Sequence, residues 1–291
     1  MRINTPFQWV TLESQWVHED NTSRLDASFY SQDVIEARIL IEHLRKEDIE
    51  IREIGDELIS KEIFWPGRFK RKYVSKKEGK PFLMPSEVFM FLPRARKFIT
   101  DFPNNVLVNE NWILITRSGT IGRCIISNKL LSSFVLSDDL IRVIPAQEDL
   151  LGYIYAYLNT WIGQAFLTKT RYGATVKHIE PHHVADIPIP LLPESDVKEI
   201  NKKILKAHKL REESQKLLLK TEQMIYTELG LPEIDEDDVK YFCGDLGGVV
   251  KAFVVRANEL NLRLDASYNK PLLTMIMKML ENKENQGDFK P

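Results

Sequence analysis

The clearest pattern along the chain is a run of apolar residues spaced alternately three and four positions apart between Asp196 and Leu229. This spacing predicts one long amphipathic helix with an apolar seam on one face. Asp196 and Glu199 match a capping box at its start, and Gly230 with Pro232 predicts its end. At about 1.5 Å per residue such a helix spans roughly 50 Å, which suits a rigid spacer or a dimerisation rod. The seam contains Val197, Ile200, Ile204, Ala207, Leu210, Ser214, Leu217, Thr221 and Met224. An ordinary helix packed on its own domain is the alternative.

The sequence before this helix mixes the periods of strands and helices. It predicts a strand starting near Ile49, a hairpin within Asn111–Asn128, a second strand pair within Phe134–Ile144 and one core helix over Leu150–Thr168. Prolines make Asp186–Pro193 extended. We therefore predict an α+β fold, in which a mixed, β-rich domain with helices precedes a long coiled-coil spacer helix.

A short string occurs twice, near the two ends of the sequence. Residues Arg24–Ser28 read RLDAS, and residues Arg263–Ser267 repeat them. The repeat indicates a long period made of a whole domain plus the helix, with a second unit that is begun and not completed. We expect these divisions: an N-terminal segment with the first RLDAS copy (1–45), the β-rich domain (46–192), the long helix (193–230), and a connector with the start of the second repeat (231–291).

Composition sets broad limits. The chain has 291 residues, 43% of them hydrophobic, and a formal net charge of −2, so a sizeable core is expected. No apolar run is long enough for a membrane span, and no secretory signal is recognised. Cys124 and Cys243 lie far apart in the sequence, which favours a reducing compartment. The expected location is the cytoplasm.

The charges are unevenly placed. Lys61–Lys80 contains eight basic residues against two acidic ones, interleaved with Phe64, Trp65, Phe69 and Tyr73. Phosphate binding requires cations on flexible side chains, and an arginine can take two acceptors of guanine at once. The alternative is a solvated charged face, with Phe64 and Phe69 anchoring the loop to the core. The candidate DNA-binding residues are Arg68, Lys70, Arg71, Lys72, Tyr73, Lys76 and Lys77.

No metal or cofactor site is predicted. Asp138 and Asp139 are adjacent residues on a predicted turn, and Pro181 interrupts the spacing between His178 and His182 that a helical zinc site would need. The sequence contains no Pro-Pro pair, which an amino-methyltransferase needs beside the flipped base. Nor does it contain a phosphate-binding glycine loop. We therefore expect a non-catalytic chain.

Several motifs occur together in one order. They are RLDAS at 24–28, PGRFKRKYV and KPFL within 66–83, TRSGTIGR at 116–123, SDDLIRVIP at 137–145, YxxxYLNTWIGQ at 153–164, GATVKHI at 173–179 and IPIPLLP at 187–193. This order resembles one target-recognition domain plus its spacer helix from the specificity subunit of type I restriction-modification systems.

The resemblance implies a DNA-recognition function for residues 46–192 and a set of partners. These are double-stranded DNA, methyltransferase (modification) subunits and the restriction subunit, with self-association or pairing to a second half-subunit through the long helix. One departure is that a complete subunit has two recognition domains and two spacer helices. The alternatives are the recognition part of a DNA methyltransferase or endonuclease enzyme, and a coiled-coil interaction protein that does not bind DNA.

Overall fold

A computed structural model describes residues 29–169 and 177–229, together with Ser14, Val17, Ile276, Met277, Leu280 and Glu281. The chain divides into two compact units, Met1–Gln215 and Lys216–Pro291. The sequence features that lie outside the described residues are both RLDAS copies, residues 170–176, the predicted helix end at Gly230 and Pro232, and Cys243.

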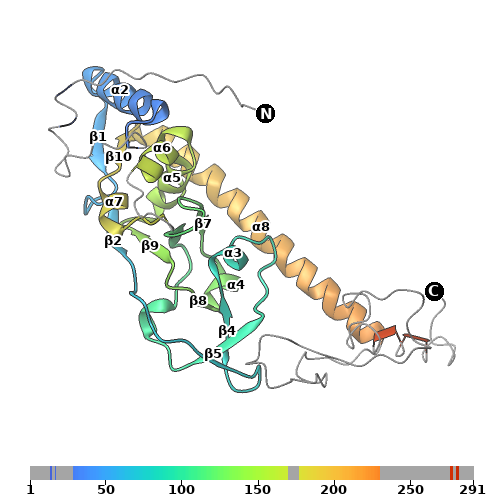
Figure 1. Ribbon diagram of the computed structural model, residues 1–291. Helices are drawn as coiled ribbons and strands as arrows, with labels where there is room; N and C mark the ends of the chain where they lie inside the picture. The colour runs from blue at the N-terminus through green and yellow to red at the C-terminus, as the bar shows by residue number, and fades with distance from the viewer. Residues whose placement is uncertain are drawn as a thin grey trace, which may run out of the picture. The chain divides into compact units, whose positions relative to one another are not determined.

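The first unit mixes helices with several small sheets, and a long helix follows, which confirms the predicted fold class (Figure 1). The helices are α2 (Gln32–Lys46), α3 (Pro85–Val88), α4 (Lys129–Ser132), α5 (Glu148–Leu158), α6 (Trp161–Lys169), α7 (Pro181–Ala185) and the long α8 (Glu194–Glu228), with a 3₁₀ turn at Asn104–Val106. No described helix combines the length and the apolar character that crossing a bilayer requires.

The strands of the described residues form three sheets. A two-stranded sheet pairs β1 (Glu50–Glu53) with β10 (Pro188–Leu191). A four-stranded antiparallel sheet has the order β2-β9-β6-β7, from Ser60–Phe64, Leu140–Pro145, Ile113–Thr116 and Cys124–Ile126. Another four-stranded sheet has the order β3-β5-β4-β8, from Lys72–Val74, Lys97–Thr100, Lys80–Leu83 and Val135–Leu136. In this last sheet β4 and β8 are parallel.

Strand β6 is buried on both faces, which explains its uninterrupted apolar sequence. Ile113 and Ile115 pack into the main core beside residues of α2, α5 and α6. Leu114, on the opposite face, packs into a second core with residues of α3, α4 and β8. The predicted hairpin is confirmed, because β6 and β7 pair antiparallel across residues 117–123.

The two-stranded sheet brings the start of the domain beside the segment that leads into α8. The Tyr153 hydroxyl donates to the Pro190 carbonyl at 2.6 Å, and the Tyr157 hydroxyl donates to the Pro188 carbonyl. Both tyrosines lie on α5. Strand β10 is therefore fixed from one side by β1 and from the other by α5 just before α8 begins.

The prediction of one helix over Leu150–Thr168 is wrong, because the segment forms α5 and α6 with a turn at Asn159 and Thr160. The Asn159 amide donates to the Tyr155 carbonyl at 2.8 Å, and the Thr160 hydroxyl accepts from the Gly163 amide at 3.2 Å. These contacts end one helix and begin the next. A Cβ on Gly163 would lie 2.3 Å from the Tyr157 carbonyl oxygen, so glycine permits the close approach.

The predicted strand pair within Phe134–Ile144 is also wrong. Both strands exist, but β8 pairs with β4 and β9 pairs with β2 and β6, in different sheets. The Ser137 amide donates to the Leu83 carbonyl at 3.0 Å, and the Asp139 carbonyl accepts from the Arg117 amide at 3.1 Å. Residues 137–139 therefore cross from one sheet to the other.

The long helix is confirmed, with a start earlier than the predicted cap at Asp196. The Pro193 carbonyl accepts from the amides of Asp196 and Val197, at 2.9 and 3.1 Å. Asp196 therefore lies inside the first turn. Its carboxylate still lies at the helix N-terminus, where negative charge is favourable.

Candidate nucleic-acid interface

The stretch Lys61–Lys80, called the basic segment below, runs from β2 through the edge strand β3 to the first residue of β4. Arg68 and Lys70 lie on the extended approach to β3, Lys72 lies on β3, and Lys76 and Lys77 lie on the turn that follows it. All five side chains are exposed. Lys72 forms an exposed ion pair with Asp101 at 3.1 Å.

The fold fixes the turn that carries Lys76 and Lys77. Strand β5 pairs with β3 on one side and β4 on the other, so the chain between β3 and β4 must cross the end of β5. A Cβ on Gly79 would lie 2.5 Å from the Val74 side chain and 3.0 Å from the Ile99 amide nitrogen. Glycine therefore allows the turn to pass directly over β5.

Tyr73 presents an aromatic surface beside this turn. Its ring is 49% exposed and meets Phe82 edge to face at 6.4 Å. The ammonium group of Lys97 lies 5.2 Å from the centre of the Tyr73 ring. An exposed ring with cations around it is a surface that nucleic acids commonly use.

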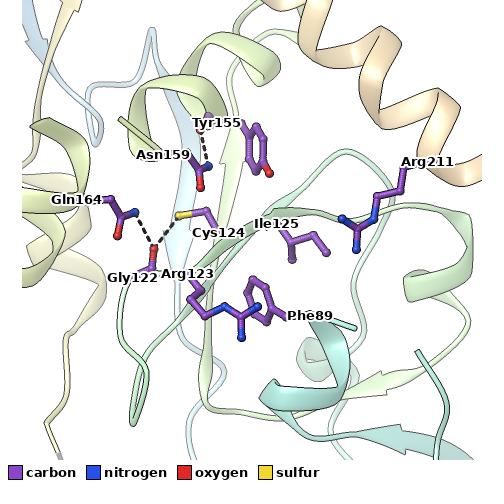
Figure 2. Close-up of a pocket in the computed structure, with 9 residues that line it drawn as sticks. All are labelled: Phe89, Gly122, Arg123, Cys124, Ile125, Tyr155, Asn159, Gln164 and Arg211. Atoms are coloured by element: carbon purple, nitrogen blue, oxygen red, sulfur yellow. Dashed lines mark hydrogen bonds between the residues drawn. The ribbon is translucent and has the colours of Figure 1, made fainter. Parts of the chain in front are cut away.

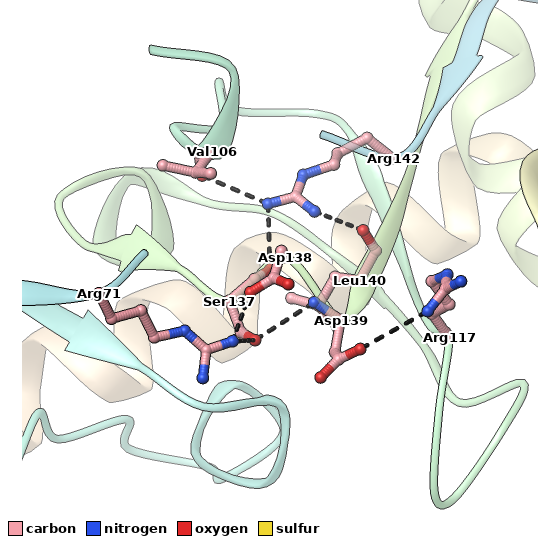
Figure 3. Close-up of polar contacts among 8 residues, drawn as sticks. All are labelled: Arg71, Val106, Arg117, Ser137, Asp138, Asp139, Leu140 and Arg142. Carbon is pink, nitrogen blue, oxygen red and sulfur yellow. Dashed lines mark hydrogen bonds and ion pairs between the residues drawn. The ribbon is translucent and has the colours of Figure 1, made fainter. Parts of the chain in front are cut away.

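Arg71 differs from its neighbours because it is half-buried and points into the domain (Figure 3). It forms an ion pair with the buried Asp138 and lies over the rings of Phe69 and Phe82, at 5.8 and 5.3 Å. Burial is the largest single influence and would lower the pKa of Arg71, but the hydrogen bond and the charge of Asp138, together with Tyr73, outweigh it, so the pKa is raised. Arg71 therefore joins the basic segment to the crossing at residues 137–139.

A second arginine supports the same crossing from inside. Arg142 has 0% exposure and donates to the carbonyls of Leu140, Val106 and Ser137, the last two at 3.3 and 3.2 Å (Figure 3). Burial lowers the pKa of Arg142 to about 10. This buried cation is not recognisable in the sequence, because Arg142 there resembles the polar position of an ordinary half-exposed strand.

Arg117 connects the β6–β7 hairpin to the start of the basic segment. Its guanidinium lies 4.0 Å from the centre of the Trp65 ring, pairs with Glu180 and approaches Asp139 at 3.8 Å. Trp65 is thereby fixed by the hairpin and is not a loosely placed loop residue. The hairpin tip is open: Gly119 has φ +73°, and a Cβ there would meet nothing within 4 Å.

The first half of α8 packs on the domain along a narrow face. Val197, Asn201 and Gln215 are buried, and Ile204, His208 and Arg211 are partly buried at intermediate steps of three or four. The buried polar residues have partners. The Asn201 side chain accepts from the Gly152 amide at 2.6 Å, and Gln215 accepts from Asn128 at 2.8 Å and donates to the Phe91 carbonyl.

The predicted seam of α8 divides between two environments. Val197, Ile200 and Ile204 pack against the domain's own core, as the alternative interpretation expected. Ala207, Leu217 and Met224 are exposed, the last two to 64% and 54%. The exposed line from Ala207 to Met224 lies roughly a third of a turn from the packed face, because successive helical residues are 3.6 to a turn.

The histidines occupy structural positions. The His183 Nδ1 atom accepts from the Glu180 amide at 3.0 Å at the start of α7, and the rings of His182 and His183 meet edge to face at 4.1 Å. Within the described part of the chain, no three His, Cys, Asp or Glu side chains are grouped so that they could hold a metal ion.

A pocket of about 320 Å³ lies between the β6–β7 hairpin, α5, α6 and α8 (Figure 2). Two arginines, Arg123 and Arg211, line it. Neither arginine was among the site residues predicted from the sequence. Two features of the sequence could have pointed to them. Arg123 directly follows the glycines of the predicted hairpin, and Arg211 lies four residues, about one helical turn, before Gln215.

Among the solved structures to which the chain is similar are the following three, all at low identity. A chain from a study of complex assembly and conformational transition of the type I R-M system has 16% identity and a TM-score of 0.42, covering 73% of this chain and 53% of that one. The HsdS subunit from Thermoanaerobacter tengcongensis has 15% identity and a TM-score of 0.40, covering 63% and 47%. A type I restriction-modification S subunit from M. genitalium has 14% identity and a TM-score of 0.40, covering 62% and 44%.

The chain spans about half the length of each of these solved proteins. No curated protein matches the sequence. Residues 46–220 match the family described as the type I restriction modification DNA specificity domain. This match covers more than half of the 291 residues and takes in the basic segment, the hairpin and most of α8. The chain therefore belongs to the type I restriction-modification DNA specificity domain family.

Proposed function

We propose that this chain binds a specific double-stranded DNA sequence as the recognition part of a specificity subunit. The observation that carries the proposal is the set of exposed cations around the edge strand β3, held on a fixed turn beside the exposed ring of Tyr73. Phosphates are bound by such cations whatever the sequence, and bases are read by side chains that reach into a groove. The family of the chain supports DNA as the ligand.

The basic residues divide by environment. Lys70, Lys72, Lys76 and Lys77 are exposed, which suits contacts with phosphates. Arg68 is the better candidate for reading a base, since it is exposed and adjoins the turn at Gly67, which has φ +79°. Arg71 is the weaker candidate, because its guanidinium already binds Asp138. A bound base would have to compete with that ion pair.

The expected partners follow from the same assignment. Specificity subunits are the non-catalytic components of restriction-modification complexes, so catalysis belongs to methyltransferase and restriction subunits. We assign the exposed seam of Ala207, Leu217 and Met224 to pairing with a second α8 helix, either in another copy of this chain or in a complementary half-subunit. The proposed location is the cytoplasm, where these subunits meet DNA.

The test is DNA binding by the full chain, with its methyltransferase subunit, at two salt concentrations. Replacing Arg68, Lys70 and Lys77 with alanine should weaken binding and reduce the slope of log affinity against log salt by about two to three units, roughly one for each lost phosphate contact. If Arg68 reads a base, Arg68→Ala alone should cost about 1–3 kcal/mol on the cognate duplex only.

The matched control replaces Lys202, Lys206 and Lys209, three exposed lysines of α8, with alanine. This variant removes the same charge and should keep affinity and salt slope close to those of the unmodified chain. If both triple variants behave alike, or neither changes the slope, the basic segment is only a solvated charged face and the proposed DNA interface is wrong.

A further inference from the structure

The pocket beneath α8 contains two arginines from distant parts of the chain (Figure 2). Arg123 comes from the end of the β6–β7 hairpin, and Arg211 reaches in from α8. The Arg123 guanidinium lies 4.5 Å from the centre of the Phe89 ring, and that of Arg211 lies 5.3 Å from the centre of the Phe91 ring. Stacking on a ring orients a guanidinium while leaving the N–H groups at its edge available.

No negative charge within the described residues balances these two cations. The pocket lining contains neither Asp nor Glu. Arg123 and Arg211 also take part in none of the ion pairs formed among residues 29–169 and 177–229. The contrast with Arg71 and Arg117 is direct, since both of those arginines are paired with carboxylates. Two oriented cations in one concave site favour an anionic ligand.

Other polar side chains of the lining already form hydrogen bonds within the protein. The Gln164 amide donates to the Gly122 and Leu158 carbonyls at 2.9 and 2.7 Å, and the Asn159 amide donates to Tyr155 within α5. The Tyr155 hydroxyl also lines the site, and burial raises its pKa, so it remains a neutral donor. The charged donors of the lining are therefore the two guanidiniums, and the Tyr155 hydroxyl is a neutral donor beside them.

The surroundings of the pocket favour a protein ligand over a DNA phosphate. Met90 and Phe91, whose carbonyls bond Arg211 and Gln215, are each 47% exposed, and Leu210 on α8 is 56% exposed. The lining has no lysine. Arginine with exposed Met and Phe, and without Lys, is the composition of protein–protein contacts. The basic segment, rich in lysine, has the opposite composition.

We propose that this pocket binds an Asp or Glu side chain of a protein partner, whose neighbouring apolar residues contact Met90, Phe91 and Leu210. The carboxylate would accept from Arg123 and Arg211, with Tyr155 as a third donor. This inference goes beyond the proposed DNA interface. The choice of the methyltransferase subunit as the partner rests on the proposed function. The experiment below therefore tests the pocket and the partner separately.

The pocket is tested first on the full chain alone, with a peptide probe. Acetyl-Leu-Glu-Phe-amide is titrated while the side-chain N–H signals of Arg123 and Arg211 are followed by NMR, and acetyl-Leu-Gln-Phe-amide is the control. Both arginine signals should shift with the Glu peptide, and Arg123→Gln, Arg211→Gln or Tyr155→Phe should each weaken the response. Absence of a shift, or equal shifts with both peptides, overturns the inference. Tighter binding of inorganic phosphate than of the Glu peptide overturns the choice of a carboxylate.

The second arm measures affinity for the purified methyltransferase subunit. Arg123→Gln and Arg211→Gln should each weaken it about tenfold or more, while Lys209→Gln, the same charge change at an exposed position of α8, should leave it within about twofold. Circular dichroism checks that each variant is folded. If the unmodified chain binds the peptide and not the methyltransferase, the proposed partner is wrong and the pocket stands. If Arg123→Gln lowers DNA affinity and its salt slope without affecting the peptide, the site contacts phosphate and the inference fails.

Discussion

Arginines that look alike in the sequence differ in burial and therefore in the groups that they contact. Arg68 is exposed to solvent, whereas Arg142 has 0% exposure and donates to backbone carbonyls at the crossing between sheets. Arg71 lies between these extremes, with one face on aromatic rings and its guanidinium on Asp138. A partly buried ion pair resists the loss of either partner, because the remaining charge is left uncompensated.

This arrangement predicts that Arg71 contributes to stability more than to base reading. Arg71→Met should lower the free energy of unfolding by about 1–3 kcal/mol, because Asp138 is then buried without its partner. Arg68→Met, its exposed neighbour, should change it by less than about 0.5 kcal/mol. Urea unfolding gives both values. A double-mutant cycle with Asp138→Asn should show a coupling of about 0.5–3 kcal/mol. A stable Arg71→Met variant that loses only cognate DNA binding would instead make Arg71 a base reader.

At the scale of elements, the sequence predicts those helices and turns whose conformation depends on neighbouring residues in the chain. The β6–β7 hairpin was predictable because two apolar runs flank glycines, and Gly119 and Gly122 have φ of +73° and +83°. The long helix was predictable from its period. The α5–α6 break could not be predicted from a helix-breaking residue, because the turn lies at Asn159 and Thr160 and the nearby Gly163, which permits the close approach to Tyr157, is itself part of α6. Thr160 was the overlooked signal, as a helix-capping residue.

The crossing between β8 and β9 was missed for a different reason. Two short apolar runs around Ser137–Asp139 look like a hairpin, and only pairing with distant strands separates them. The same limit applied to the site. The sequence located the basic segment, but the ion pair of Arg71 spans 67 positions and the Arg123–Arg211 pocket requires α8 to be docked. Contacts between residues so far apart in the sequence depend on the topology of the fold, and the hydrophobic periodicity of a short segment carries no information about that topology.

The docking of α8 predicts an effect at Asn201. Its side chain accepts from the Gly152 amide, so Asn201→Ala removes a buried hydrogen bond between α8 and α5 and should cost about 0.5–1.5 kcal/mol of unfolding free energy. Lys202→Ala, at the next and exposed position, should be nearly neutral. Hydrogen exchange at the Gly152 amide should become faster in the Asn201 variant. Unchanged exchange and stability would mean that the apolar contacts of Val197 and Ile204, with the hydrogen bonds of Gln215, hold the helix without help from Asn201.

For the whole molecule, the important property is that α8 has two different faces. One face packs on the domain that precedes α8, through Val197, Ile204 and the side chains of Asn201 and Gln215. The other presents exposed apolar residues that a folded protein rarely leaves uncovered in a line. Polar contacts at two points along the packed face fix its register against the domain.

This division leads to a prediction about assembly. Leu217→Asp with Met224→Asp places two charges on the exposed face and should abolish self-association or pairing with a second half-subunit, because a coiled-coil seam does not tolerate unpaired buried carboxylates. The domain should stay folded, since neither side chain is buried in the chain itself. Val197→Asp with Ile204→Asp is the matched variant on the packed face, and it should lower the unfolding temperature. Analytical ultracentrifugation and thermal unfolding distinguish the two variants. If the Leu217 and Met224 variant still associates as strongly as the unmodified chain, the exposed seam is not the pairing surface, and α8 serves only to carry the domain.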